Sequence, residues 1–201
     1  MKTGISFIFT ALLEDFQEDN AENAVKNGFL PHIHYRGLTQ PHDPNHNNHI
    51  TWVSTNAEHA SEYANGQGSS FNADKTNTPN ITPLYIKSNT PVHLGYRVST
   101  TETTDSELLG RVKNRIMDAY QNKQTDLHTA KKAFDMLDKV PTTNTYNRAW
   151  HWRDSIPEVK QSLQMVGYDS FEDTEMHNGE PIKTIGLFDK SQLHPIYKPF
   201  K

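Results

Sequence analysis

Hydrophobic and polar positions alternate over short runs in the first third of the chain, which is typical of β-strands. Polar loops over 40–49 and 65–79 separate these runs, and residues 20–26 are predicted as a short helix closed by Gly28. The runs predicted as strands are 7–11, 29–37, 50–55 and 84–87. A later run predicts a returning strand, with Ile182, Thr184 and Gly186 on one face and Ile185 and Leu187 on the other.

The middle of the chain changes to the helical period, with apolar residues three or four positions apart. The pattern Thr104-x-x-Glu107 is a capping box that predicts a helix start, and Thr55-x-x-Glu58 predicts another directly after the strand at 50–55. Ser155-x-x-Glu158 opens the last helix, which Gly167 ends. The apolar stripes of the three middle helices are Leu108, Val112, Ile116 and Tyr120; Leu127, Ala130, Phe134 and Leu137; and Val159, Leu163 and Val166.

Strands, then a helical block, then a returning strand predict an α+β fold rather than alternating β-α-β units. The length of 201 residues suits a single domain over 1–201, with the helices as an insertion at about 104–166. The chain has no cysteine, which excludes disulfides, thiolate metal sites and cysteine nucleophiles. A net charge of -4 disfavours a nucleic-acid partner, and the chain lacks the roughly 18–20 consecutive apolar residues of a membrane helix.

Two familiar kinds of site are not expected. His42, His46 and His49 have the spacing of zinc ligands on a helix, but Pro44 and the intervening Asn and Asp residues favour a solvated loop, so we expect no metal. The glycine motifs of dinucleotide-binding and phosphate-binding loops are also missing. A metal-dependent hydrolase built on the histidine loop is therefore the weakest alternative.

Polar residues at the strand ends remain as candidates, although each has an ordinary structural explanation when taken alone. Arg36 precedes Gly37, Ser54 and Thr55 end a strand, and Tyr63 lies on the helix that follows. A late acidic cluster consists of Glu172, Asp173, Glu175 and Glu180.

Read in order, five segments over roughly 29–195 resemble the ADP-ribosyltransferase superfamily, especially its small bacterial and phage-type members. The first segment ends a strand in Arg-Gly. The second joins a strand that ends in Ser-Thr to a helix that ends in Ala-x-x-Tyr-Ala. The last resembles the family's closing strand, which is followed by Phe-Asp-x-x-Gln. These segments are 34–39, 52–64, 85–92, 167–171 and 185–193.

The resemblance implies a split β-sheet that holds NAD+ as a substrate and needs no metal. It implies that Arg36, with Gly37 beside it, grips a phosphate or the nearby ribose, that Ser54 and Thr55 support the site, and that Tyr63 stacks on the nicotinamide. The resemblance also implies a carboxylate that stabilises the positive charge on the ribose. Lys183 and Thr184 occupy about the place where the better-known members have glutamate, so the candidates are Glu180 and Glu175, ranked level, with Glu172 behind.

The activity implied is mono-ADP-ribosylation of a macromolecule, with protein favoured over nucleic acid as the acceptor. A phage or bacterial effector or toxin fits this activity, acting in the cytoplasm of a bacterial or host cell, with secretion as one route. The alternative is an inactive relative that keeps the fold as a binding module, and Thr184 in the expected glutamate position favours it.

Overall fold

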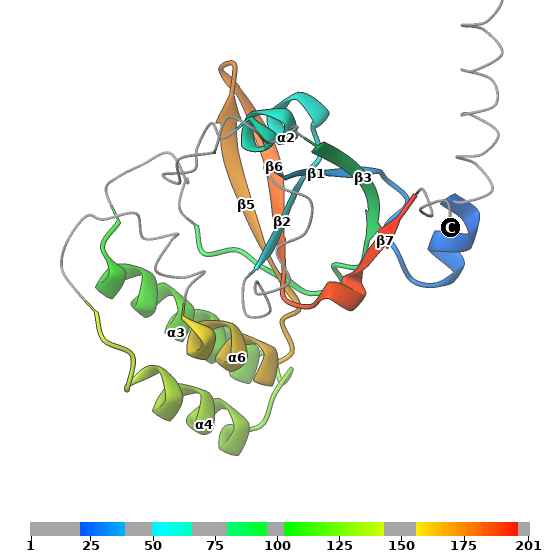
Figure 1. The fold of residues 1–201 in the computed structure, drawn as a ribbon. Helices are drawn as coiled ribbons and strands as arrows, with labels where there is room; N and C mark the ends of the chain where they lie inside the picture. The colour runs from blue at the N-terminus through cyan, green and yellow to red at the C-terminus, as the bar shows by residue number, and fades with distance from the viewer. Residues whose placement is uncertain (1–20, 39–49, 66–79, 96–102, 143–155, 197–201) are drawn as a thin grey trace, which may run out of the picture.

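The protein folds around one mixed, seven-stranded sheet with helices packed on it (Figure 1). The computed structural model describes residues 21–38, 50–65, 80–95, 103–142 and 156–196. The α+β class is confirmed. The predicted strand at 7–11, the histidines at 42, 46 and 49, and Ser155 lie outside the described residues.

The sheet has the strand order β4-β5-β6-β2-β1-β3-β7. Its β4 runs parallel to β5, and the other neighbours are antiparallel. The strands are β1 (His34–Leu38), β2 (Thr51–Ser54), β3 (Asn80–Ile86), β4 (Pro91–Val92), β5 (Ser170–His177), β6 (Glu180–Leu187) and β7 (Leu193–Pro195).

The strands β1 and β2, near the middle of the sheet, pair over a shorter length than the other neighbouring strands. A single register pair, Tyr35 opposite Ser54, joins these two strands. By contrast β1 and β3 pair at five positions, and β2 and β6 pair at four. Figure 1 shows β1 and β2 running in different directions, and their contact joins the strands β4-β5-β6-β2 to the strands β1-β3-β7 within the one sheet.

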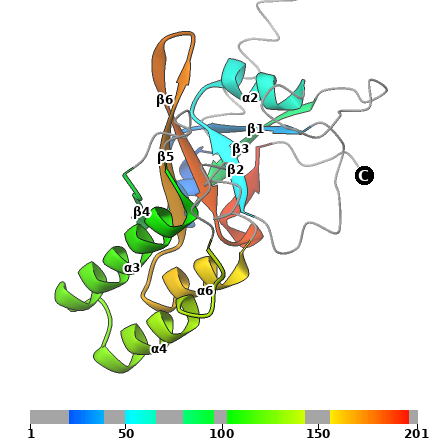
Figure 2. The same cartoon turned by 90° about the vertical axis from the view of Figure 1, so that its left-hand side faces the viewer.

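Three helices form a layer against one end of the sheet, and both views place this layer well apart from α2 (Figures 1 and 2). They are α3 (Asp105–Gln121), α4 (Leu127–Leu137) and α6 (Pro157–Met165). Their buried residues pack with Phe171 of β5, Phe188 after β6 and the partly buried Trp52 of β2. The capping box is confirmed, because the Thr104 side chain accepts from the Glu107 N–H and the Glu107 side chain accepts from the Thr104 N–H.

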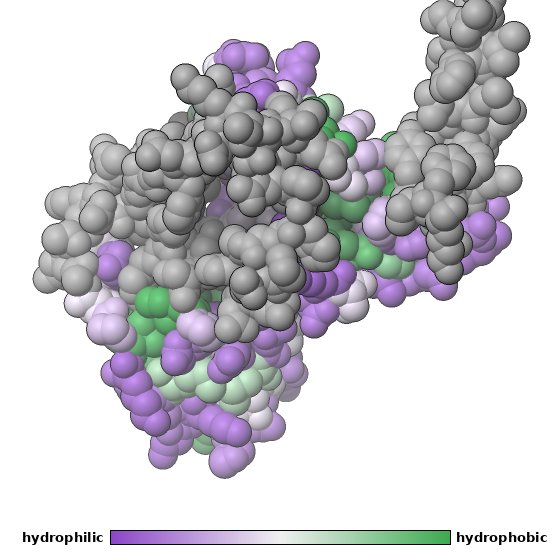
Figure 3. Space-filling model, viewed as in Figure 1, coloured by the Kyte–Doolittle hydropathy of each residue, from purple (hydrophilic) through white to green (hydrophobic). Residues whose placement is uncertain are grey.

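Two residues of the predicted stripes are exposed instead of buried. Tyr120 is 37% exposed and Ala119 is buried in its place, because each step of four residues turns about 40° beyond a full helical turn and the error accumulates. Leu127 is 63% exposed at the first position of α4. Figure 3 shows green and pale green patches between purple ones over the helical layer.

The helix α2 (Ala57–Ala64) covers the other end of the same sheet face. The prediction of Thr55 as its cap is wrong by one residue: Asn56 is the N-cap and accepts from the His59 N–H. Asn caps a helix as well as Thr does, and the Thr55 hydroxyl donates to the Lys183 carbonyl of β6 instead. The helix α6 begins one residue later than the Ser155-x-x-Glu158 pattern predicts, because its N-cap is Ile156, which makes no side-chain cap hydrogen bond, and Pro157 is its first residue.

The opposite face of the sheet carries a second apolar cluster of Val53, Leu84, Ile86, Ile185 and Leu187. The predicted alternation of β6 is therefore confirmed, and Thr184 and Gly186 are buried as well because both faces are covered. None of the described helices has the length and apolar character needed to cross a membrane.

The closing segment ties distant parts of the chain together. After β6, Asp189 caps a short 3-10 helix, η1 (Lys190–Gln192). The Gln192 amide donates to the carbonyls of Lys87 and Asp169, at 2.8 and 3.1 Å. The Asp169 carboxylate accepts from the backbone N–H of Asn89 and of Thr90. Three of the five segments quoted above thus meet at this one end of the sheet.

Candidate functional site

The strongest polar cluster of the described residues lies between α2 and the hairpin end of β5. Side chains alternate along a strand, so Asp173, Glu175 and His177 of β5 all face the side of the sheet that α2 covers. Residues four apart on a helix share a face, so His59 and Tyr63 of α2 project together. The fold places both of them against Glu175.

Two side chains of α2 contact the Glu175 carboxylate. The Tyr63 hydroxyl donates a hydrogen bond to Oε2 of Glu175, which lies 112 residues further along the sequence. His59 Nε2 lies 3.4 Å from the same oxygen. The Glu175 side chain is 15% exposed and His59 is 3% exposed, whereas Tyr63 is 38% exposed. The cluster therefore has a buried half around His59 and an accessible edge at Tyr63.

The environment of Glu175 keeps its carboxylate ionised. Burial by itself would raise the pKa of this group, but hydrogen bonds from His59 and Tyr63 outweigh it and hold the pKa below its usual range. The buried Thr184 hydroxyl lies nearby and adds to this effect, although its geometry falls short of a full hydrogen bond. A lasting negative charge at this position is suited to stabilising a cationic transition state.

A second pair of α2 side chains, Glu58 and Glu62, faces His177 of β5. Glu58 and Glu62 are also one helical turn apart. Glu62 Oε1 lies 3.1 Å from His177 Nδ1, and Glu58 Oε2 lies 3.8 Å from His177 Nε2. The His177 side chain is 7% exposed, and its ring centroid is 5.5 Å from that of His59. The pair His59 and Tyr63 thus contacts Glu175, and the pair Glu58 and Glu62 contacts His177, so two sets of contacts hold α2 against β5.

Ser54 belongs to this cluster, whereas Thr55 and Gly37 have structural contacts. Ser54 is 3% exposed, and its hydroxyl lies 3.1 Å from His59 Nδ1. Thr55 is exposed directly after the end of β2, and its hydroxyl donates to the Lys183 carbonyl of β6. A Cβ on Gly37 would lie 1.8 Å from the Ala60 carbonyl oxygen, so this glycine lets α2 lie directly on β1.

Arg36 lies on the opposite face of the sheet from Glu175. Tyr35 pairs with Ser54 and Gly37 lies under α2, so the intervening Arg36 points to the other side. Burial lowers the pKa of Arg36, which still remains charged at neutral pH. Glu172 shares this opposite face and pairs with Lys183 at 2.7 Å. The sheet therefore separates the predicted residues into two groups.

Glu180 lies at the exposed start of β6, opposite His177 in the β5–β6 register. It follows the Asn178–Gly179 turn, where both residues have positive φ angles of 50° and 84°. This is the two-residue turn that matches the twist of a β-hairpin. Of the two carboxylates ranked level, Glu175 is the one that the fold brings to Tyr63.

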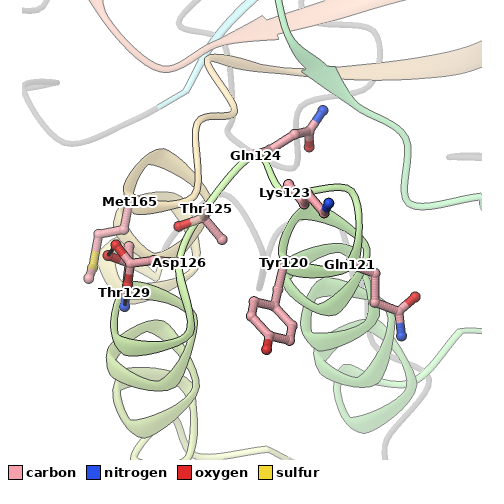
Figure 4. A pocket seen from close by; sticks show the side chains of 8 residues that line it. All are labelled: Tyr120, Gln121, Lys123, Gln124, Thr125, Asp126, Thr129 and Met165. Carbon is pink, nitrogen blue, oxygen red and sulfur yellow. Dashed lines mark hydrogen bonds between the residues drawn. The ribbon is translucent and has the colours of Figure 1, made fainter.

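The described residues contain no group of three or more histidines and carboxylates placed to hold a metal ion. Two surface hollows lie in the helical layer, away from Glu175. One, of about 630 Å³, is lined by Tyr120, Lys123, Asp126, Thr129 and Met165, among others, where α3 turns into α4 (Figure 4). The other, of about 460 Å³, lies along α3 at Arg111 and Arg115. Both arginines donate to carbonyls of residues 93–95, so they hold that segment in place.

Sequence reasoning missed His59 and His177. The signal for His59 was its position four residues before Tyr63, which puts both on one helix face. The signal for His177 was the Asn-Gly pair directly after it, which predicts a tight hairpin and hence which strand residues share a face with Glu175.

Comparison with known proteins adds no assignment. No family model and no curated protein matches the sequence, and no solved structure matches the fold.

Proposed function

We propose that the protein is a mono-ADP-ribosyltransferase that uses NAD+ to modify a macromolecule, with Glu175 as its carboxylate and Tyr63 at the nicotinamide. The observation that carries the proposal is the contact between these two side chains. The family resemblance gave roles to both residues, and they come from segments that are 112 residues apart in the sequence. The narrow contact between β1 and β2 also supports the proposal, because the family resemblance implies a split sheet.

In the proposed reaction, the bond between C1′ of the ribose and the nicotinamide nitrogen breaks, and nicotinamide leaves with the electron pair. Positive charge develops on the ribose, as in glycoside cleavage. The ionised Glu175 would stabilise this charge, and the exposed ring of Tyr63 would stack on the departing nicotinamide. An acceptor nucleophile then bonds to C1′ and loses its proton. The net charge of -4 favours protein over nucleic acid as the acceptor, because a phosphate backbone is bound through Lys and Arg.

The test is nicotinamide release from NAD+, measured with and without a cell lysate, followed by mass spectrometry for added ADP-ribose. Wild-type protein should release nicotinamide with the lysate and label an acceptor. Glu175→Gln should lower turnover by about 100-fold or more, the order expected for losing one stabilising group. Glu22→Gln is the matched control, because Glu22 is 77% exposed and pairs with Lys26 one turn away.

Two further variants examine the other carboxylates. Glu180→Gln tests the exposed hairpin position, and Glu172→Gln tests the face that carries Arg36. Loss of turnover in Glu172→Gln with full activity in Glu175→Gln would move the site to that face and overturn the assignment of Glu175. Binding of NAD+ by wild-type protein without turnover would identify the inactive binding module instead, and failure to bind NAD+ would overturn both.

Tyr63 is tested by two substitutions. Tyr63→Phe keeps the ring and removes the hydroxyl that donates to Glu175, whereas Tyr63→Ala removes both. If stacking is its role, KM for NAD+ should rise much more in Tyr63→Ala than in Tyr63→Phe. Equal effects on KM would contradict stacking, and a melting temperature lowered only in Tyr63→Ala would indicate that the ring mainly packs.

A further inference from the structure

A buried chain of hydrogen-bonding groups leads from β2 through α2 to Glu175. Ser54 Oγ lies 3.1 Å from His59 Nδ1, and His59 Nε2 lies 3.4 Å from Glu175 Oε2. Ser54 and His59 are each 3% exposed. The rings of Tyr63 and His177 pack against His59 in edge-to-face geometry, with centroids 5.2 and 5.5 Å away, so the imidazole is enclosed on several sides.

The directions of these hydrogen bonds depend on the tautomer of His59, and its partners favour one of them. An ionised carboxylate only accepts, so a proton on His59 Nε2 is the one that suits the 3.4 Å contact with Glu175. The Ser54 hydroxyl accepts from the Asn56 N–H at 3.0 Å and keeps its own proton. In the tautomer that carries its proton on Nε2, His59 accepts the Ser54 hydroxyl proton at Nδ1. In this arrangement every group of the chain has a partner.

We infer that His59, held by Ser54, is a positioning residue that orients the Glu175 carboxylate and favours its ionised form. For catalysis this inference rests on the proposed function, in which Glu175 faces the ribose. Ser54 is not a nucleophile in this arrangement, because it is buried and its oxygen accepts from the backbone next to the helix cap. Its contribution is to hold the imidazole in one tautomer and one orientation.

The experiment is a carbon-13 NMR titration of the Glu175 carboxyl group, identified by the signal that Glu175→Gln lacks. The variants are His59→Leu, which removes both ring nitrogens, His59→Gln, which keeps a side-chain N–H donor, and Ser54→Ala. His34→Gln is the matched control, because His34 is also 3% exposed but lies on the opposite face of the sheet.

We expect the pKa of Glu175 to rise by about one pH unit in His59→Leu, because burial remains and a donor is lost. The rise should be smaller in His59→Gln and in Ser54→Ala, and absent in His34→Gln. An unchanged pKa of Glu175 in the His59 variants would overturn the inference. An equal rise in His34→Gln would overturn it too, because the effect would then be one of general packing. If His59→Leu does not fold, the other two variants decide the question.

Kinetics separate this inference from the proposed function. Nicotinamide release by His59→Gln should show kcat lowered about tenfold, with KM for NAD+ within about twofold of wild type, since misplacing the carboxylate affects the transition state. If wild-type protein releases no nicotinamide, the proposed function fails, and the titration alone then decides whether His59 positions Glu175.

Discussion

Gly37→Ala is expected to displace α2 and with it one side of the candidate site. The added Cβ would lie 1.8 Å from the Ala60 oxygen and 2.9 Å from both the Ala60 carbonyl carbon and the Ala64 nitrogen. All three are backbone atoms, so no side-chain rotation relieves the clash. The helix would have to move by roughly 1.5 Å to restore ordinary contact distances.

Overpacking of this kind costs about 1–3 kcal/mol. Movement of α2 would also weaken the hydrogen bond from Tyr63 to Glu175, which as a bond to a charged group contributes about 1.5–3 kcal/mol, and the 3.4 Å contact of His59 with the same carboxylate. We therefore expect the free energy of unfolding to fall by about 3 kcal/mol or more, which is a large share of the stability of a typical domain.

The assay is urea unfolding followed by circular dichroism, with the midpoint and the slope compared between variants. Gly110→Ala is the control, because Gly110 lies inside α3 and an added Cβ would have no atom within 4 Å. That control should gain about 0.5–1 kcal/mol from the higher helix propensity of alanine. An unchanged midpoint for Gly37→Ala would refute the close approach of α2 to β1.

Two more predictions concern pH and the helical layer. The folded pKa of Glu175 lies below its ordinary value of 4.5, so its contribution to stability is present above about pH 4.5 and is lost as the pH falls through the folded pKa. The difference in unfolding free energy between wild type and Glu175→Gln should therefore shrink as the pH falls over that range. A difference that grows there would refute the reasoning. Leu163→Ala should cost about 2–5 kcal/mol in urea unfolding, because Leu163 is fully buried between the helices, whereas Leu127→Ala, at a 63% exposed position, should change stability by no more than about 0.5 kcal/mol; equal losses would contradict the described packing.

Local signals in the sequence predicted the local structure well. The Thr104–Glu107 capping box acts within one turn, so the start of α3 is where the pattern places it. Pro157 begins α6 and Gly167, with a φ of 98°, follows its end, for the same reason. The prediction of Thr55 as a cap failed, because two adjacent residues could cap the helix and the pairing of β2 with β6 decided between them.

By itself the sequence determined the α+β class and the start of α3, and the family resemblance named Arg36, Tyr63 and two level carboxylates, Glu175 and Glu180. The tertiary structure decided which candidates meet: it brought Tyr63 to Glu175, added His59 and left Arg36 on the other face of the sheet. The physical reason is that helix caps and turns depend on neighbours in the chain. The face that a strand residue occupies depends on the register with strands more than a hundred residues away, and a shift of one residue reverses it.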